Sequence, residues 1–399
     1  MVNMVATGIV GLIFWRIAAQ FFPETSQIGI AGTLIAITNI ASILAASGLM
    51  PVVMLMFSNK GDGKHFADHI IGFKTVASIV SSLMAVIISF ALMFVPNFEF
   101  LQNPIIVLLL VLLSGSMASG LVLDYSMVAT GQSRYVPYRN VLVSVLKTVF
   151  LAGIVWVASS AGEGILLATL IAKLFGNSIY TFKGTGKNFT GWQQTITVLK
   201  SLKDNLFSHQ VSSLTASLPP VLAPIIITGV LSTSEAGLFT IAWLLAGLLF
   251  YAATAVSNAF LTDAANLHYR VIKIQIRKAI MFGSLIIFIG LIGFIVLGEL
   301  FLNFFGKNYV EAYIMLILLS AAAVPDFFKN ILIAYSRSRH FLNIPTIINS
   351  VSGILTVLAL FMLPVIFNVE VVGWIWITVA SLSALGAWGL IKHSERKLS

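Results

Sequence analysis

The sequence predicts an all-α polytopic membrane protein with about twelve transmembrane helices, arranged as two six-helix lobes. Composition is the first observation: the chain has 399 residues, of which 58% are hydrophobic and 9% charged, whereas soluble domains carry roughly 25% charged residues. The second is a series of apolar stretches, each close to the ~20 residues that a helix needs to cross the hydrocarbon. The third is an unequal distribution of basic residues among the gaps between these stretches.

Six stretches form the predicted N-terminal lobe, residues 1–183. The first ends at Pro23, and the second is long enough to be tilted or bent, with Pro51 near its end. Gly162 and Gly164 mark a tight turn before the sixth. These predicted spans cover residues 3–22, 27–57, 69–95, 104–130, 141–159 and 164–182.

A polar segment, residues 184–203, is the longest stretch outside the predicted spans, and we take it as the linker between lobes. The remaining chain, residues 204–399, forms the predicted C-terminal lobe. Its spans cover residues 205–230, 236–262, 279–298, 312–334, 345–367 and 371–391.

The two lobes resemble each other in sequence. Segment 26–29 (Ser-Gln-Ile-Gly) opens the second span, and segment 234–237 (Ser-Glu-Ala-Gly) opens the eighth, 208 residues later. Segment 129–134 (Ala-Thr-Gly-Gln-Ser-Arg) ends the fourth span, and segment 334–339 (Ala-Tyr-Ser-Arg-Ser-Arg) ends the tenth, 205 residues later. Because each lobe has an even number of spans, the repeat is parallel, with its pseudo-twofold axis along the membrane normal.

Basic residues fix the expected orientation. Alternate gaps hold most of the 23 basic residues, whereas the other gaps hold Lys307 alone among a series of glutamates. Positive residues stay on the cytoplasmic side during insertion, so both termini are predicted to be cytoplasmic in a multi-pass protein of the cell membrane. The basic gaps hold Lys60, Lys64, Arg134, Arg139, Lys183, Lys187, Lys200, Lys203, Arg270, Lys273, Arg277, Lys278, Arg337, Arg339, Lys392, Arg396 and Lys397.

Several function classes lack support in the sequence. The formal net charge of +9 would suggest nucleic acid in a soluble protein, but here the basic residues flank spans near anionic lipid, and no nucleic-acid partner is expected. The absence of cysteine excludes thiol catalysis and thiolate metal sites. No HExxH pair occurs, and segment 184–187 (Gly-Thr-Gly-Lys) lacks the first glycine and the Ser/Thr of a phosphate-binding loop. We therefore predict no enzyme, no metal and no cofactor.

Five basic residues fall within predicted spans, where a charge costs about 2.5–3.5 kcal/mol and usually faces water or a partner. Lys173 lies near the middle of its span, and Arg16 lies about six residues from the outer end of its own span. Lys74 and Lys147 lie close enough to a helix end to snorkel. The fifth is Lys329. An interior that is basic on balance suits an anionic cargo, because Lys and Arg bind phosphate through charge-assisted hydrogen bonds.

Two acids share the spans, Asp124 and Asp326. Asp326 and Lys329 lie three residues apart on one helical face and can neutralise each other. Asp124 and Lys329 are separated by 205 residues, the repeat offset, so an alternative hypothesis makes them a gate pair at equivalent places in the two lobes.

The seventh span is the most polar. Ser208 and Ser212, with Asn205 and Thr215, follow helical spacing along one face, His209 lies beside it, and three prolines follow. Such hydroxyls can simply bond their own backbone, but the stripe and the breaks favour a helix that lines a wet cavity. His209 is interpreted as a hydrogen-bonded pore residue rather than a metal ligand.

Several apolar segments resemble the oligosaccharide (Wzx-type) flippases, the polysaccharide biosynthesis proteins of the MOP superfamily. Many relatives have Ala-Arg where this chain has Ala19-Gln20, and Arg16 lies one turn earlier. The resembling segments are 8–15 (Gly-Ile-Val-Gly-Leu-Ile-Phe-Trp), 18–20 (Ala-Ala-Gln), 28–31 (Ile-Gly-Ile-Ala), 237–243 (Gly-Leu-Phe-Thr-Ile-Ala-Trp) and 304–312 (Phe-Phe-Gly-Lys-Asn-Tyr-Val-Glu-Ala).

The resemblance implies a MATE-like fold and transport of a lipid-(pyro)phosphate-linked oligosaccharide by alternating access, for surface polysaccharide biosynthesis. Phosphate would contact Arg16 and Lys173, with Lys74, Lys147 and Lys329 as further candidates, and sugar hydroxyls would contact Ser208, His209 and Ser212. Asp124, Asp326 and Asp204 are the nearby acids for a coupling cation, H+ or Na+. The implied partners are the lipid-linked oligosaccharide, membrane lipids, and a polysaccharide polymerase or glycosyltransferases.

Three rival functions stay open, one of which is a non-transporting scaffold for an envelope assembly complex. A MATE-like multidrug or cation exporter on the same architecture would favour an acidic, aromatic-lined cavity. A membrane-embedded glycosyltransferase would need a catalytic acid in an outer loop, and these predicted loops hold one or two Glu and no Asp.

Overall fold

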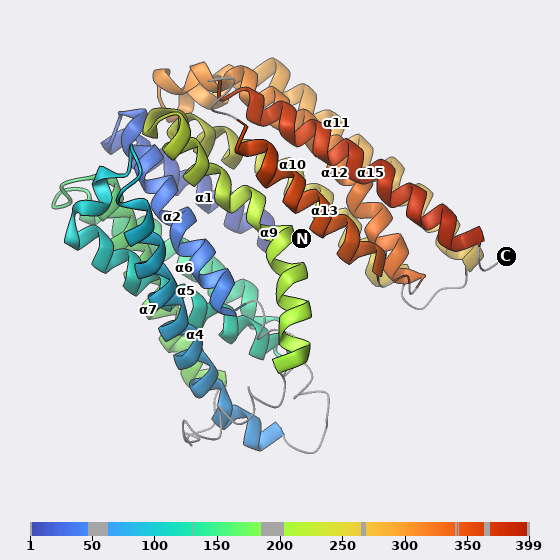
Figure 1. Ribbon diagram of the computed structural model, residues 1–399, viewed down its shortest axis with the longest axis horizontal. Helices are drawn as coiled ribbons and strands as arrows, with labels where there is room; N and C mark the ends of the chain where they lie inside the picture. Colours follow the sequence, from blue (N-terminus) through green and yellow to red (C-terminus); the bar gives the residue numbers. More distant parts are fainter. Residues whose placement is uncertain are drawn as a thin grey trace. The chain divides into compact units, whose positions relative to one another are not determined.

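The computed structural model describes residues 2–46, 63–129, 131–184, 203–264, 269–339, 341, 343–362 and 368–396. Within these ranges, the description omits the side chains of residues 2–6, 63–69, 182–184, 203–214, 216, 269–271 and 273. All regular structure in the described ranges is helical (Figure 1), which confirms the predicted all-α class.

Twelve α-helices and two short 3-10 helices make up the described part of the chain. Nine of the α-helices are long and apolar enough to cross a membrane. The apolar parts described for α1 and α9 are shorter. In order, the elements are α1 (Val2–Phe21), α2 (Thr25–Ala46), α4 (Gly63–Leu92), η1 (Glu99–Gln102), α5 (Pro104–Ala129), α6 (Tyr135–Ile154), α7 (Ala161–Gly184), α9 (Lys203–Val230), α10 (Thr233–Ala264), α11 (Tyr269–Phe305), η2 (Lys307–Ala312), α12 (Tyr313–Ser338), α13 (Asn343–Leu360) and α15 (Val371–Arg396).

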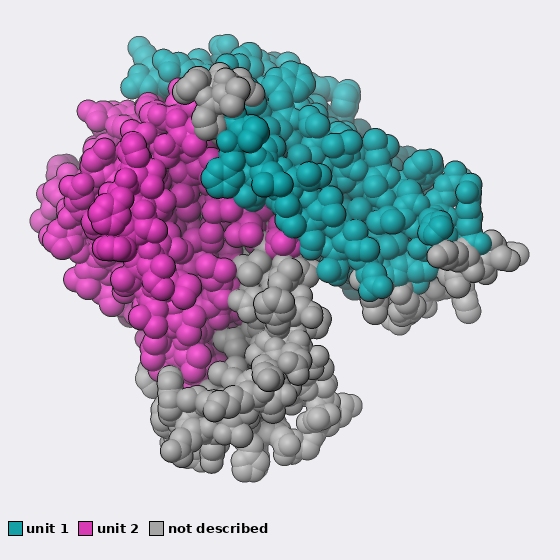
Figure 2. Space-filling model, in the orientation of Figure 1, with its two compact units in different colours: residues 1, 237–399 teal, residues 2–236 magenta. Residues whose placement is uncertain are grey.

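The helices divide into two compact units (Figure 2), residues 2–236 and residues 237–399, with Met1 counted in the second. Helix α9 belongs to the first of these, which we call the N-unit, because it packs against α2. The other is the C-unit. The predicted linker 184–203 lies almost wholly outside the described residues, so the predicted lobe boundaries stay a prediction.

Helix α2 forms the centre of the N-unit and packs against α4, α5, α7 and α9. Its Ala, Gly and Ile residues are mostly buried, and the small ones let neighbouring helices approach closely. Thr33 of α2 and Thr228 of α9 are fully buried, and their hydroxyl oxygens lie 2.7 Å apart. Without water, a buried hydroxyl needs a protein partner, and this pair satisfies both groups at once.

Serines join α4 to α5. Ser78, Ser81 and Ser82 donate hydrogen bonds to backbone carbonyls of α5 at 2.9, 2.9 and 3.1 Å. Gly115 makes the crossing possible, because a Cβ there would lie 2.8 Å from the Ser82 hydroxyl oxygen and 3.2 Å from the Ser78 carbonyl oxygen. Small residues at the crossing thus let two membrane helices pack backbone to backbone.

In the C-unit, α12 packs against α11, α13 and α15. The Tyr335 hydroxyl donates to the Glu395 carboxylate at 2.6 Å, which ties the end of α12 to the end of α15. Helix α10 contributes Trp243, whose ring lies 5.2 Å from that of Trp376 on α15. These contacts give the C-unit its own core.

Large apolar side chains cover the outside of α11, including Leu285, Phe288, Ile289 and Val296, which are 54–70% exposed. A water-soluble protein rarely exposes so continuous an apolar surface. The surface fits a hydrocarbon environment, in agreement with the predicted multi-pass membrane protein.

One boundary departs from the sequence prediction in a way that matters for the site. Helix α6 begins at Tyr135, whereas the predicted span begins at residue 141. Pro137 lies in the first turn, where its missing N–H has no intrahelical partner to lose. Arg139, predicted in a cytoplasmic gap, therefore lies inside a helix and is buried at 1% exposure.

Candidate functional site

A buried ion pair joins α5 to α6 in the N-unit. The Arg139 guanidinium donates through Nη2 to Oδ2 of Asp124 at 2.8 Å. A hydrophobic cluster containing Leu123, Met127 and Tyr180 packs at the same ends of α5 and α7. In such an apolar setting each charge needs a partner, and Asp124 and Arg139 supply it to each other.

Further acceptors hold the Arg139 guanidinium. Nη1 donates to the Gly120 carbonyl at 2.8 Å and lies 3.4 Å from the Asn177 side-chain oxygen. Gly120 leaves the space, because a Cβ there would lie 3.2 Å from the Asn177 oxygen and 3.5 Å from Arg139 Nη1. Asn177 in turn donates to the Ser116 carbonyl at 2.8 Å. The ion pair is thus fixed to α5, α6 and α7 together.

Two lysines from the predicted site lie beside this pair. Lys173 of α7 is half-buried and close enough to Arg139, Asp124 and Lys147 to interact with each electrostatically. It makes no hydrogen bond or ion pair with any described residue. Lys147 of α6 places its ammonium 4.4 Å from the centre of the buried Phe14 ring, a cation–π contact with α1.

The charges do not balance within this group, which we call the basic cluster: Asp124, Arg139, Lys147 and Lys173. The group holds three cations and one carboxylate. Asp124 is bonded to Arg139 and interacts electrostatically with Lys173, whereas Lys147 interacts with Lys173. One oxygen of Asp124 and the Nε of Arg139 are buried without a hydrogen-bond partner among the described residues. The cluster therefore carries an excess of positive charge that an anion would neutralise.

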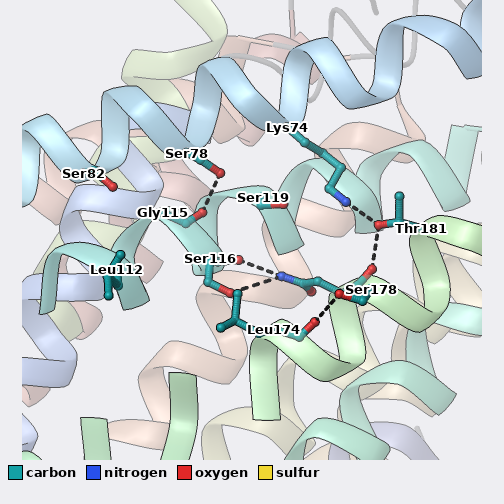
Figure 3. Close-up of a pocket in the computed structure, with 11 residues that line it drawn as sticks. Lys74, Ser78, Ser82, Leu112, Gly115, Ser116, Ser119, Leu174, Ser178 and Thr181 are labelled. Atoms are coloured by element: carbon teal, nitrogen blue, oxygen red, sulfur yellow. Dashed lines mark hydrogen bonds between the residues drawn. The ribbon is translucent and has the colours of Figure 1, made fainter. Parts of the chain in front are cut away.

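Lys74 lies apart from the basic cluster, in a polar groove of about 410 Å³ between α4, α5 and α7 (Figure 3). Its ammonium donates to the Thr181 hydroxyl, and Thr181 donates to the Asn177 carbonyl at 2.6 Å. Lys74 is also within electrostatic reach of Arg139. A chain of polar contacts thus runs from the groove to the ion pair.

The basic residue predicted in the C-unit has an acidic partner. Lys329 donates to Asp326 at 2.5 Å on the same turn of α12, and Asn330 donates to the other oxygen of Asp326 at 2.8 Å. This is the neutralising pair that the spacing of three residues favours. Because Asp124 and Lys329 each have a partner within their own unit, the predicted gate pair between them would require both ion pairs to open.

The remaining predicted site residues have less defined surroundings. Arg16 is half-buried on α1, the helix that packs against α6. Ser208, His209 and Ser212 lie on helix α9, but their side chains are outside the described residues, as is that of Asp204. Their roles stay predictions. Among the described residues, no group of three His, Asp or Glu could hold a metal ion.

Sequence reasoning missed two residues, Arg139 and Asn177. Arg139 was assigned to a gap because it precedes the apolar stretch, although Pro137 in a first helical turn is a signal that the helix starts earlier. Asn177 lies four residues after Lys173, on the same face of α7. That spacing was the available signal for a second polar residue beside the lysine.

Together, the fold and the basic cluster define an α-helical, multi-pass membrane protein of two units with an electropositive group inside one of them. No protein-family model and no curated protein sequence matches this chain. Solved structures match this chain over almost its full length. Their sequence identities are low, so the match establishes the fold alone.

The structural neighbours are transporters of the MOP superfamily. The lipid II flippase MurJ, in an inward closed conformation, has a TM-score of 0.75 at 14% identity, covering 98% of this chain and 87% of that one. A multidrug resistance MATE transporter in an inward-facing conformation has a TM-score of 0.69 at 15% identity, covering 98% and 95%. A MOP-superfamily transporter from Pyrococcus furiosus, described by the reverse polarity of its binding pocket, has a TM-score of 0.61 at 15% identity, covering 100% and 94%. The predicted MOP/MATE-like architecture is therefore confirmed.

Proposed function

We propose that this protein is a flippase that moves a lipid-(pyro)phosphate-linked oligosaccharide across the cytoplasmic membrane by alternating access. Among the transporters that share its fold are a lipid flippase and drug exporters, so the fold alone leaves the cargo open. The observation that carries the proposal is the basic cluster, which contains three cations and a single carboxylate that is bonded to Arg139. The resemblance in sequence to oligosaccharide flippases of surface polysaccharide biosynthesis adds independent support.

Charge is the physical argument for an anionic cargo. An uncompensated cation inside a membrane protein is costly and normally faces water or a partner. A diphosphate linkage supplies negative charge and several acceptor oxygens in one compact group, which suits ammonium and guanidinium donors. A cationic drug would add like charge to the cluster and be repelled.

The four residues of the cluster have different expected roles. Lys173 presents an ammonium with three N–H donors, none of which is used within the described chain, so we assign it the direct phosphate contact. Lys147, held against Phe14, provides a second positive charge. Arg139 and Asp124 position α5, α6 and α7 and so fix where Lys173 stands. Arg16, Lys74 and Lys329 stay secondary candidates.

We assign sugar recognition to α9 because its sequence places polar residues at helical spacing along one face. Ser208, His209 and Ser212 offer hydroxyl and imidazole groups of the kind that bond sugar hydroxyls. The lipid tail would stay in the bilayer, where the exposed apolar surface of the helices already meets hydrocarbon. Polysaccharide polymerases or glycosyltransferases would act on the cargo before or after this step.

Coupling to a cation is constrained by the ion pairs. Asp124 is bonded to Arg139 and Asp326 to Lys329. A proton or sodium ion that used either carboxylate would compete with its basic partner for the negative charge. The membrane potential, which acts on the charge of the cargo itself, needs no such exchange.

The alternative on the same fold is a MATE-like exporter of cations. A cluster of aromatic rings in the C-unit supports it. The centre of the Trp243 ring lies 5.8 Å from that of Phe239, 5.3 Å from that of Phe250 and 5.2 Å from that of Trp376. Aromatic faces attract cations. However, the two membrane acids that would complete such a site are occupied by Arg139 and Lys329, so we favour the anionic cargo.

Binding to the purified protein separates these functions. We expect an isoprenyl-diphosphate-linked oligosaccharide to bind in nonionic detergent and to be displaced by isoprenyl diphosphate, while ethidium binds weakly. Ethidium binding that the diphosphate lipid does not affect would instead support the exporter. Transfer of sugar by the purified protein to an acceptor would support the glycosyltransferase alternative.

A further inference from the structure

The groove around Lys74 is a feature that the basic cluster does not explain. It lies between α4, α5 and α7 of the N-unit and measures about 410 Å³. Figure 3 shows Lys74 and Thr181 at one end and Ser82 and Leu112 at the other. Asn177 also lines the groove.

The groove is positively charged and contains hydrogen-bond donors that no described residue accepts. Lys74 is the only charged residue among the described residues that line it. One of its three N–H donors bonds Thr181, which leaves two. The Ser119 hydroxyl, which also faces the groove, has no hydrogen-bond partner among the described residues. An anion with acceptor oxygens would satisfy these groups.

Apolar side chains surround this polar groove. Leu112 on α5 is 49% exposed and Leu174 on α7 is 52% exposed, and both line it, while the adjacent Phe175 is 53% exposed. On helices that cross a membrane, such residues meet acyl chains. A lysine and serines open to that environment are costly unless a polar group comes to them. The surroundings therefore favour a ligand with an anionic head and apolar tails.

The position of Lys74 indicates the leaflet. Lys74 lies eleven residues after the start of α4 at Gly63, and Thr181 lies three residues before the end of α7 at Gly184. Both ends are on the side that the charge distribution predicts to be cytoplasmic. A headgroup can reach this end of the groove from that leaflet without crossing the hydrocarbon.

We propose that the groove between α4, α5 and α7 binds the phosphate headgroup of an anionic phospholipid from the cytoplasmic leaflet. Lys74 and Ser119 contact the phosphate, and Leu112 and Leu174 contact the acyl chains. The lipid site is distinct from the cargo contact that we assign to Lys173, and it can be tested without cargo. Through Thr181 and Asn177 it contacts Arg139, so a bound lipid adds to the order of the α5–α6–α7 cluster.

The test is lipid binding to the purified full-length chain, in nonionic detergent and with no cargo present. Phosphatidylglycerol and phosphatidylcholine with identical acyl chains are titrated, and bound lipid is counted by native mass spectrometry. We expect phosphatidylglycerol to bind and Lys74→Gln to weaken this binding about tenfold, the effect of losing one charge-assisted hydrogen bond. Lys278→Gln, at an exposed position on α11, is the matched control and should bind normally.

A second variant guards against misfolding. Ser178 lies exposed at the groove and bonds only the carbonyl of its own helix at Leu174, so Ser178→Phe obstructs the groove while leaving Lys74 in place. It should also weaken phosphatidylglycerol binding. Native affinity in both variants, equal binding of phosphatidylcholine, or equal protection by inorganic phosphate in a thermal unfolding assay would each overturn the proposal. None of these outcomes bears on the flippase proposal, because no cargo is present.

Discussion

Arg139 and Asp124 form an ion pair of 2.8 Å between helices α6 and α5, with Arg139 only 1% exposed. The pair does two things. It joins α5 to α6, the helix that carries Lys147, while Arg139 also bonds Asn177 of α7, the helix that carries Lys173. It also occupies the only acid within the basic cluster. The positive charge of the two lysines is consequently left for a ligand.

Removing either member of this ion pair should destabilise the protein, and the two effects should not be additive. We expect Asp124→Asn to lower the free energy of unfolding by about 3 kcal/mol, because it leaves a buried guanidinium without its counter-ion. Arg139→Gln should have a similar effect, and the double variant should cost less than the two single effects added together. The measurement is equilibrium unfolding in mixed micelles. Simple additivity would show that the two side chains do not interact.

Gly120 should be sensitive to size. A Cβ at this position lies at 3.2 Å from the Asn177 oxygen and 3.5 Å from Arg139, so Gly120→Val would push both groups out of place. We expect a loss of about 1–3 kcal/mol, as for other overpacked positions, seen as a lower thermal midpoint. Gly153→Val on α6 is the control, since nothing lies within 4 Å of a Cβ there. Equal losses of stability in the two variants would mean that valine destabilises any helix at these positions and that a clash with Asn177 and Arg139 does not contribute.

The hydroxyl pair between α2 and α9 offers a test of packing in the N-unit. Thr33→Val and Thr228→Val keep the shape of each side chain but remove a hydrogen bond of 2.7 Å. Interhelical hydrogen bonds in membranes couple by about 0.6 kcal/mol on average, so a double-variant cycle should give a coupling energy of that size. Thr262→Val, at an exposed position where threonine bonds its own helix, should have no coupling with either. A coupling energy of zero between Thr33 and Thr228 would contradict the hydrogen bond.

Sequence patterns predicted the fold class well, because membrane insertion depends on apolar length and flanking charge, both of which are local properties. The helix that carries Arg139 shows where local reasoning fails. Arg139 resembles a cytoplasmic flanking residue in sequence, and only the packing of α5 against α6 reveals that Asp124 is there to neutralise it.

The candidate site could be predicted only in part, because local sequence properties identify charges within spans but do not show which helices meet. Lys147 and Lys173 were identified as costly charges within spans, and the structure brings them to one cluster. Lys74, expected to snorkel or to contact cargo, lines a polar groove between α4, α5 and α7, and its contact with cargo stays a prediction. Which helix faces meet is a matter of tertiary packing, and hydropathy does not encode it.

We propose that the positively charged Lys173 binds the phosphate of an anionic cargo during transport. Translocation in proteoliposomes tests this role most directly. Transfer of a fluorescent isoprenyl-diphosphate oligosaccharide between leaflets is followed by a quencher that reaches only the outer leaflet. Lys173→Gln should slow transfer about tenfold or more through loss of a charge-assisted hydrogen bond, whereas Lys173→Arg and the control Lys278→Gln should retain most of the rate. Transfer at the native rate by a folded Lys173→Gln variant would contradict the account.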